Sequence, residues 1–210
     1  MDGYKTVFLE ATGEVTEKKS RFIATLRHVE TNEDAFEFIN AMRSKYYDAR
    51  HNVYAYILKD GTKRYSDDGE PSGTSAMPSL NVLEGYELVD TAVVITRYFG
   101  GTLLGTGGLV RAYSQAVKTA VENAEIVTMC LCSCINITCD YSLWERIRKA
   151  SEDIGAVIDN VDFAADVTVY ISLKKELTEQ LIESVTELSD GRAGILVTGE
   201  KFTGIKAPIT

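Results

Sequence analysis

The sequence has no apolar run that approaches the roughly 18 residues a membrane-spanning helix needs. Its first residues also lack the basic stretch followed by an apolar stretch that marks a secretory signal peptide. These two absences argue against a membrane or secreted protein, and we expect a cytoplasmic location. Of the 210 residues, 45% are hydrophobic and 25% are charged, as in ordinary globular proteins. The length allows one large domain or two small ones.

The chain also lacks an excess of basic residues. Its net charge is -9, and acidic residues outnumber basic ones both before and after residue 132. A generic polyanion binder carries the opposite balance. The composition therefore argues against tight, nonspecific binding of nucleic acid and leaves room only for a local basic cleft.

Paired cysteine spacing of the zinc-knuckle type is absent as well. Cys130, Cys132 and Cys134 alternate, so on a strand they share one face, and neither His28 nor His51 is near them in sequence. A soft metal could bind such an array, but structural zinc sites usually show short knuckle spacing. We favour small apolar residues of a strand in a reducing compartment, and we expect no metal site and no cofactor.

The most informative stretch of the sequence is residues 91–113. Residues 92–95 are continuously apolar, which predicts a strand buried on both faces near the middle of a sheet. Apolar residues at helical spacing predict a helix after residue 108. Between them stand Arg97 and five glycines: Gly100, Gly101, Gly105, Gly107 and Gly108.

The order strand, glycine-rich loop, helix predicts an anion site, because the first N–H groups of the helix are free to bind one. Arg97 and Arg111 flank this site in the sequence. The alternative is a tight turn whose glycines serve packing only. The stretch has neither the Gly-Lys-Ser/Thr ending of a Walker loop nor the spacing of a Rossmann fingerprint.

Residues 66–78 predict a long loop with three carboxylates, Asp67, Asp68 and Glu70. Carboxylates so placed could hold Mg²⁺, act as general acid and base, cap helix ends, or pair with Arg97 and Arg111. The later ligands of an EF-hand loop are absent. A metal site is the less favoured of these alternatives, because hard cations need several converging oxygens.

The second half of the chain has a plan of its own. We predict strands at residues 133–139, 156–161, 167–173 and 194–198, and helices at 141–154 and 176–188. Their order, β-α-β-β-α-β, is the ferredoxin-like plan. We therefore predict an α+β protein of two domains, residues 1–130 with the glycine-rich loop and residues 131–210.

Four blocks resemble, in order, the signatures of the IMPACT/YigZ family: residues 20–24 (SRFIA), 49–55 (ARHNVYA), 65–74 (YSDDGEPSGT) and 97–113 (RYFGGTLLGTGGLVRAY). The resemblance covers about the first 125 residues by motif and the remainder by layout. It implies a β-α-β first domain like the second domain of a ribosomal protein, followed by a ferredoxin-like domain similar to one in translocating elongation factors. Leu103 stands where some members carry lysine, which weakens the case for a side-chain phosphate clamp.

The resemblance also implies a translation-associated regulator, because the first-domain fold is used on ribosomes and RNA. Eukaryotic members modulate a stress kinase that controls translation initiation; they carry a further N-terminal partner-binding domain that we do not expect here, so that partnership is not carried over. We predict binding of RNA, the ribosome or a nucleotide-like, phosphate-containing anion through one cleft. The predicted ligand-binding residues are Arg97, Gly100, Gly101, Gly105, Gly107, Gly108, Arg111, His51, Asp67, Asp68 and Glu70.

Two alternatives stay open. The first is a metal-dependent enzyme acting on a phosphorylated small molecule, with His51 as general acid or base and the loop carboxylates as metal ligands. No nucleophile–base pair is legible in the sequence, so we assign no catalytic residue and favour a protein that is not an enzyme. The second is a protein-interaction module in which the cleft has a structural role only.

Overall fold

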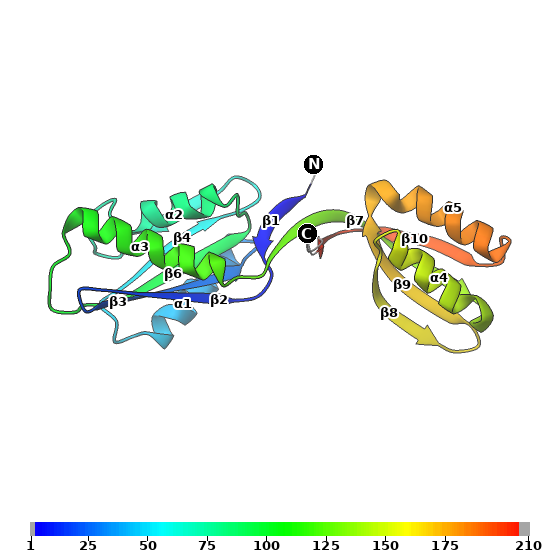
Figure 1. Cartoon of the computed structure of the whole chain (residues 1–210), viewed down its shortest axis with the longest axis horizontal. Helices are drawn as coiled ribbons and strands as arrows, with labels where there is room; N and C mark the ends of the chain where they lie inside the picture. Colours follow the sequence, from blue (N-terminus) through cyan, green and yellow to red (C-terminus); the bar gives the residue numbers. More distant parts are fainter. Residues whose placement is uncertain (1–2, 206–210) are drawn as a thin grey trace. The chain divides into compact units, whose positions relative to one another are not determined.

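The computed structural model describes residues 3–205 of the chain. It divides into two compact units, Tyr4–Thr128 and Met129–Ile205, which are described separately. Each combines helices with a sheet (Figure 1), so the predicted α+β class and two-domain organisation are confirmed. Within residues 3–205, no helix has both the length and the apolar character needed to cross a bilayer.

The first unit is built on a five-stranded antiparallel sheet with the strand order β2-β3-β6-β4-β5. The predicted buried strand is β6, which lies in the middle of this sheet. The strands are β1 (Tyr4–Val7), β2 (Ala11–Glu17), β3 (Ser20–His28), β4 (His51–Ile57), β5 (Lys63–Ser66) and β6 (Thr91–Tyr98). The helices are α1 (Asn32–Lys45), α2 (Ala76–Gly85) and α3 (Gly105–Glu122).

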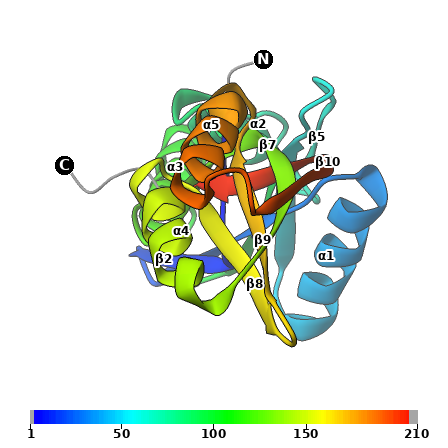
Figure 2. The same ribbon diagram turned by 90° about the vertical axis from the view of Figure 1, so that its right-hand side faces the viewer.

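Strand β6 is buried on both faces because helices cover both faces of the sheet. Its Val93 and Ile95 side chains join the hydrophobic core under α2 and α3, whereas Ala92 and Val94 join the core under α1. Figure 2 shows α1 apart from α2 and α3. Side chains of a strand alternate between faces, so a continuous apolar run is what this three-layer arrangement requires.

Helix α3 lies very close to the sheet. Its inward face carries small residues, including Ala116 and Ala120, both fully buried. At Gly13 on β2, a Cβ atom would lie only 2.2 Å from the backbone nitrogen of Ala120. Only glycine on the strand and small residues on the helix permit this approach, which fixes α3 relative to the sheet.

The second unit has the element order β7-α4-β8-β9-α5-β10, as the β-α-β-β-α-β prediction requires. Its sheet has the order β8-β9-β7, with β10 also paired to β7. The elements are β7 (Ile126–Cys139), α4 (Tyr141–Asp153), β8 (Val157–Phe163), β9 (Val167–Lys174), a 3₁₀ turn (Lys175–Leu177), α5 (Thr178–Ser189) and β10 (Gly194–Ile205).

Two predicted strand limits in this half are wrong. Strand β7 begins at Ile126, not at residue 133, and continues through the segment where we expected a break. Strand β10 extends to Ile205, not to residue 198. Strand β7 pairs with β9 and β10, and a local hydrophobic pattern does not reveal such partners, which are distant in sequence.

The close approach of α3 leads to a first prediction. Gly13→Ala should lower the free energy of unfolding by about 2–3 kcal/mol, because the added methyl group meets backbone atoms that cannot turn away. Gly107→Ala is the matched control: it lies inside α3, has open space around it, and should be neutral or stabilise by up to about 1 kcal/mol. Urea denaturation of both variants measures the difference. Equal stabilities would contradict the packing described here.

Candidate functional site

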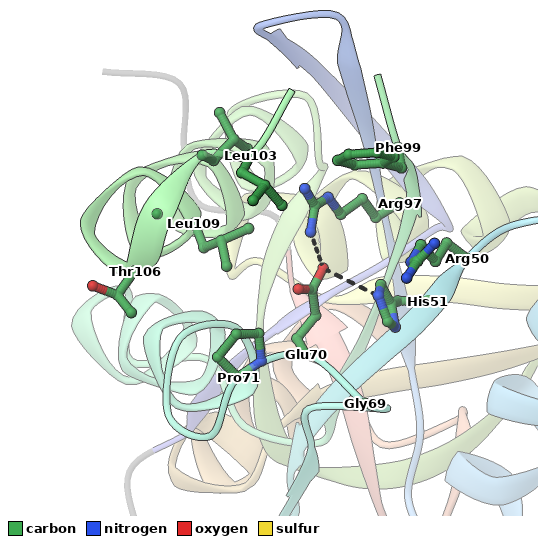
Figure 3. Close-up of a pocket in the computed structure, with 12 residues that line it drawn as sticks. Arg50, His51, Gly69, Glu70, Pro71, Arg97, Phe99, Leu103, Thr106 and Leu109 are labelled. Atoms are coloured by element: carbon green, nitrogen blue, oxygen red, sulfur yellow. Dashed lines mark hydrogen bonds and ion pairs between the residues drawn. The ribbon is translucent and has the colours of Figure 1, made fainter. Parts of the chain in front are cut away.

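A pocket of about 500 Å³ opens in the first unit where four chain segments meet. These segments are the start of β4, the loop before α2, the end of β6 with the loop after it, and the first turns of α3 (Figure 3). The lining residues are Arg50, His51, Gly69, Glu70, Pro71, Arg97, Phe99, Leu103, Leu104, Gly105, Thr106 and Leu109.

A buried ion pair forms the polar wall of this pocket. Arg97 Nη1 donates to Glu70 Oε1 at 2.5 Å, and the two side chains are only 6% and 3% exposed. The sheet register places Arg97 between Phe22 of β3 and His51 of β4, so the guanidinium group emerges from the middle of the sheet. Removing two charges from water is costly and requires further hydrogen bonds to offset it.

Tyr113 of α3 provides one of these hydrogen bonds. Its hydroxyl group donates to Glu70 Oε1 at 2.8 Å. Burial, followed by the negative charge of Glu70, raises the pKa of Tyr113 far above its ordinary value, so the phenol stays protonated and remains a donor. The Tyr113 ring also contacts the Phe22 ring edge-on, with the centroids 5.0 Å apart. The ion pair thus connects the loop, β6 and α3.

One buried donor of Arg97 has no partner in the described part of the protein. This donor is the Nε atom of the guanidinium group. The guanidinium carbon lies 5.3 Å from the centroid of the Phe22 ring and 5.7 Å from that of the Phe99 ring. Buried donors are nearly always hydrogen-bonded, so an unused one beside a pocket calls for an explanation.

His51 lies on the other side of Glu70. Its Nδ1 atom is 2.7 Å from the backbone carbonyl oxygen of Asp68, and because a carbonyl only accepts, Nδ1 carries a proton and donates. The opposite nitrogen, Nε2, lies 3.8 Å from Glu70 Oε1, as the dashed line in Figure 3 marks. The histidine ring is therefore oriented by the loop and presents Nε2 to the pocket.

The start of α3 adds a partial positive charge. Leu104 is the N-cap residue and has no side-chain acceptor for the first N–H groups, and the first turn contains no acidic residue. Gly105 begins the helix at φ +70°, a conformation that favours glycine. Gly105 and Thr106 line the pocket, so unused N–H groups of the helix lie at its wall.

Arg50 contributes a full positive charge at the mouth. It is exposed, and no carboxylate in residues 3–205 pairs with it. Its guanidinium carbon lies 5.7 Å from the centroid of Phe99. Since Glu70 neutralises Arg97, the local excess of positive charge comes from Arg50 and the start of α3. A chain of net charge -9 thus presents a locally basic pocket.

The structure brings together part of the predicted site. His51, Glu70, Arg97 and Gly105 meet at the pocket, as one converging cleft requires. Sequence reasoning missed Arg50, Phe99 and the apolar residues around them. Arg50 stood inside one of the four sequence blocks, and its unpaired charge next to His51 was the available signal.

Arg111 lies outside this pocket, although the sequence analysis expected it to flank the same site as Arg97. It borders a separate depression of about 410 Å³ with Gly108, Glu17 and Lys118. Arg111 is six residues beyond Gly105, which places it about 9 Å further along the helix.

The remaining glycines have backbone roles. A Cβ at Gly100 would lie 2.1 Å from the backbone carbon of Lys19, so this glycine lets the loop touch the β2–β3 turn. Gly101 takes φ +81°, and Gly107 and Gly108 form the first turns of α3. None of these four glycines is among the residues that line the pocket.

Asp67 and Asp68 are engaged in structural hydrogen bonds. Asp67 accepts from the backbone N–H groups of Gly73, Ser75 and Ala76 and from the Ser75 hydroxyl group, and so caps α2 from the loop. Asp68 Oδ2 accepts from the Asn52 backbone N–H at 2.6 Å. Their oxygens therefore face the protein's own donors, as one of the alternatives left open by the sequence requires.

Metal-ligating groups do not converge in the described part of the chain, where no cluster of three or more His, Cys, Asp or Glu side chains could hold an ion. The four cysteines are free thiols, and Cys132 and Cys139 are buried. Burial raises the pKa of the Cys132 thiol, and the neighbouring Cys130 adds to the shift, so the protonated form is favoured.

Comparison with known proteins places the chain in context. A family model described as the Impact N-terminal domain matches residues 18–121, and one described as a domain of unknown function matches residues 137–192. IMPACT family member YvyE of Bacillus subtilis is 34% identical over 197 residues, which cover 93% of this chain and 91% of that protein. IMPACT family member YigZ of Escherichia coli is 32% identical over 187 residues, covering 87% and 92%. A crystal structure of a hypothetical protein is 30% identical, with a TM-score of 0.62 over 96% of this chain and 100% of that one.

The ion pair leads to a second prediction. Glu70→Ala should lower the free energy of unfolding by about 3–5 kcal/mol, because it leaves the Arg97 charge buried and unpaired. The double variant Glu70→Leu with Arg97→Met removes both charges and should recover most of that loss. Urea denaturation compares the two. A double variant as unstable as the single one would contradict the assignment of the loss to an unpaired charge.

The cap of α2 leads to a third prediction, on pH. Burial opposes ionisation of Asp67, but the hydrogen bonds from Ser75, Ala76 and Gly73 outweigh it and lower the pKa below its ordinary value of 3.8. The folded state thus holds this proton less tightly than the unfolded state, so the stabilisation is present above that value and is lost as the pH falls below it.

Asp67→Asn should therefore cost about 1–2 kcal/mol of unfolding free energy at neutral pH. The difference from the unsubstituted protein should shrink as the pH falls from about 5 to about 3. Denaturant titrations across this range measure it. A difference that stays constant with pH would show that the charge of Asp67 does not stabilise the cap.

Proposed function

Because the chain belongs to the IMPACT family, we propose that it is a translation-associated regulator that binds RNA, the ribosome or a nucleotide-like anion. The binding site is the pocket at the start of α3, and the regulator acts in the cytoplasm. The family resemblance supports the association with translation. The geometry of the pocket supports the binding of an anion and is the main observation behind this proposal.

The observation that supports anion binding most strongly is the unused donor of Arg97. Its Nε atom is buried without a partner in the described residues, next to the unused N–H groups of an uncapped helix. An anionic oxygen in the pocket would satisfy both kinds of donor at once. The pair with Glu70 fixes the position of the guanidinium group at the wall of the pocket.

Recognition of an anion accounts for the site better than metal-dependent catalysis does. Asp67 and Asp68 direct their oxygens at backbone donors, and Glu70 accepts from Arg97 and Tyr113. A metal ion would have to compete with all of these donors. A purely structural role for the pocket does not explain why the Arg97 Nε donor is unpaired or why the exposed charge of Arg50 has no carboxylate partner in the described residues.

This proposal gives a fourth prediction, which compares two exposed arginines of the same unit. Arg50→Gln should weaken binding to a short single-stranded RNA or to ribosomes about tenfold, because a charge-assisted hydrogen bond contributes about 1.5–3 kcal/mol. Arg111→Gln removes the same charge outside the pocket and should change binding less than about twofold. Co-sedimentation and filter binding at two salt concentrations measure both.

Both variants replace exposed side chains, so both should keep the melting temperature of the unsubstituted protein. If both variants weaken binding equally, the pocket is not the binding site, and general surface charge accounts for the effect. If neither variant alters binding, the proposed site is wrong.

A further inference from the structure

The pocket has two chemically different halves. One half is polar and holds Arg97, Arg50, His51 and the start of α3. The other half is apolar and is formed by Pro71, Phe99, Leu103, Leu104 and Leu109. A site for inorganic phosphate alone would need only the first half. The apolar half indicates a ligand that joins an anionic group to a flat or apolar body.

Phe99 is the most informative residue of the apolar half. It is 40% exposed, although large aromatic side chains are usually buried in cores. The guanidinium carbons of Arg50 and Arg97 each lie over this ring, 5.7 Å from its centroid, and Figure 3 shows the three side chains together. Aromatic rings beside arginines are the surfaces on which nucleobases stack.

Leu103 also lines the pocket and is 83% exposed. A lysine at this position would add a further exposed positive charge to the pocket, whereas the leucine adds apolar surface. An exposed leucine and an exposed phenylalanine in one pocket favour contact with the face of a base over contact with a phosphate. The volume of about 500 Å³ lies in the range of pockets that enclose one small molecule, so it suits a single nucleotide and not a strand.

The burial of Arg97 favours a terminal phosphate group over an internal phosphodiester. Its side chain is only 6% exposed, so a ligand must direct a group inward to reach Nε. An internal phosphodiester of a nucleic acid has chain on both sides and lies along a surface. A terminal phosphomonoester has one attachment and can enter a pocket. It also carries about -1.5 to -2 charge at neutral pH and three acceptor oxygens, which suits several unused donors.

We propose that the pocket binds a nucleoside with a terminal phosphomonoester, as a free mononucleotide or as the end of an RNA chain. The phosphate contacts Arg97 Nε, Arg50 and the first N–H groups of α3, and the base lies against Phe99 and Leu103. This inference rests on the proposed function and adds the class of ligand to it.

The test uses isothermal titration calorimetry on the full chain with six probes. They are adenosine 5′-monophosphate, adenosine, inorganic phosphate, cyclic adenosine 3′,5′-monophosphate, and a short RNA with or without a 5′-phosphate. The monophosphate should bind at least about tenfold more tightly than adenosine and the cyclic diester, because both lack the dianionic group. It should also bind at least about tenfold more tightly than inorganic phosphate, which lacks the base.

Single substitutions test the apolar half and the polar half of the pocket separately. Phe99→Leu keeps an apolar side chain and should weaken the monophosphate at least about fivefold while leaving inorganic phosphate unchanged. Arg50→Gln should weaken both probes about tenfold. Arg111→Gln, outside the pocket, is the matched control and should change neither. Both test positions are exposed, so thermal melts should confirm that the variants fold.

The outcomes separate this inference from the proposed function. If inorganic phosphate binds as tightly as the monophosphate, or if the cyclic diester does, the inference is overturned and the anion site stands. If the RNA binds equally with and without its 5′-phosphate, and more tightly than the monophosphate, the terminal phosphomonoester is not what is recognised. If no anion binds at all, both the inference and the anion-binding part of the proposed function are wrong.

Discussion

The buried pair of Arg97 and Glu70 is the interaction on which the rest of the first unit depends. Two charges that are almost fully removed from water remain there only when each has a close partner. Glu70 has two, because Tyr113 donates to the same oxygen as Arg97. One carboxylate oxygen thereby holds together the loop before α2, the central strand and the long helix. Glu70 neutralises Arg97, whose buried Nε atom has no hydrogen-bond partner among the described residues.

The glycine-rich loop serves this arrangement through backbone geometry. Gly100 lets the loop touch the β2–β3 turn, and Gly105 takes a positive φ, so that α3 begins at the pocket. The free N–H groups of α3 and the exposed Arg50 then supply positive character that the buried pair does not. This explains how an acidic protein presents a basic pocket: net charge is a property of the whole surface, and recognition depends on the few charges that face the ligand.

The sequence predicted the secondary structure around this site better than it predicted the residues that line the pocket. The continuous apolar run of β6 and the helical spacing of apolar residues along α3 are local patterns, so the places of both elements in the fold could be predicted. The loop carboxylates left capping and pairing with arginine open, and the structure uses both: Asp67 caps α2 and Glu70 pairs with Arg97. Arg111 was misplaced because nearness in sequence to a glycine loop ignores the rise of the helix. The full lengths of β7 and β10 depend on partners distant in sequence, which no local pattern encodes.

The most direct test of this account is a nitrogen-15 nuclear magnetic resonance titration that observes arginine Nε–H and backbone amide signals as inorganic phosphate is added. The account predicts that the Arg97 Nε–H signal and the amide signals of Gly105 and Thr106 shift together and saturate at one phosphate concentration, while the Arg111 Nε–H signal stays in place. If the Arg97 signal does not move while signals of scattered surface residues do, the buried guanidinium group serves the fold alone and the pocket is not an anion site.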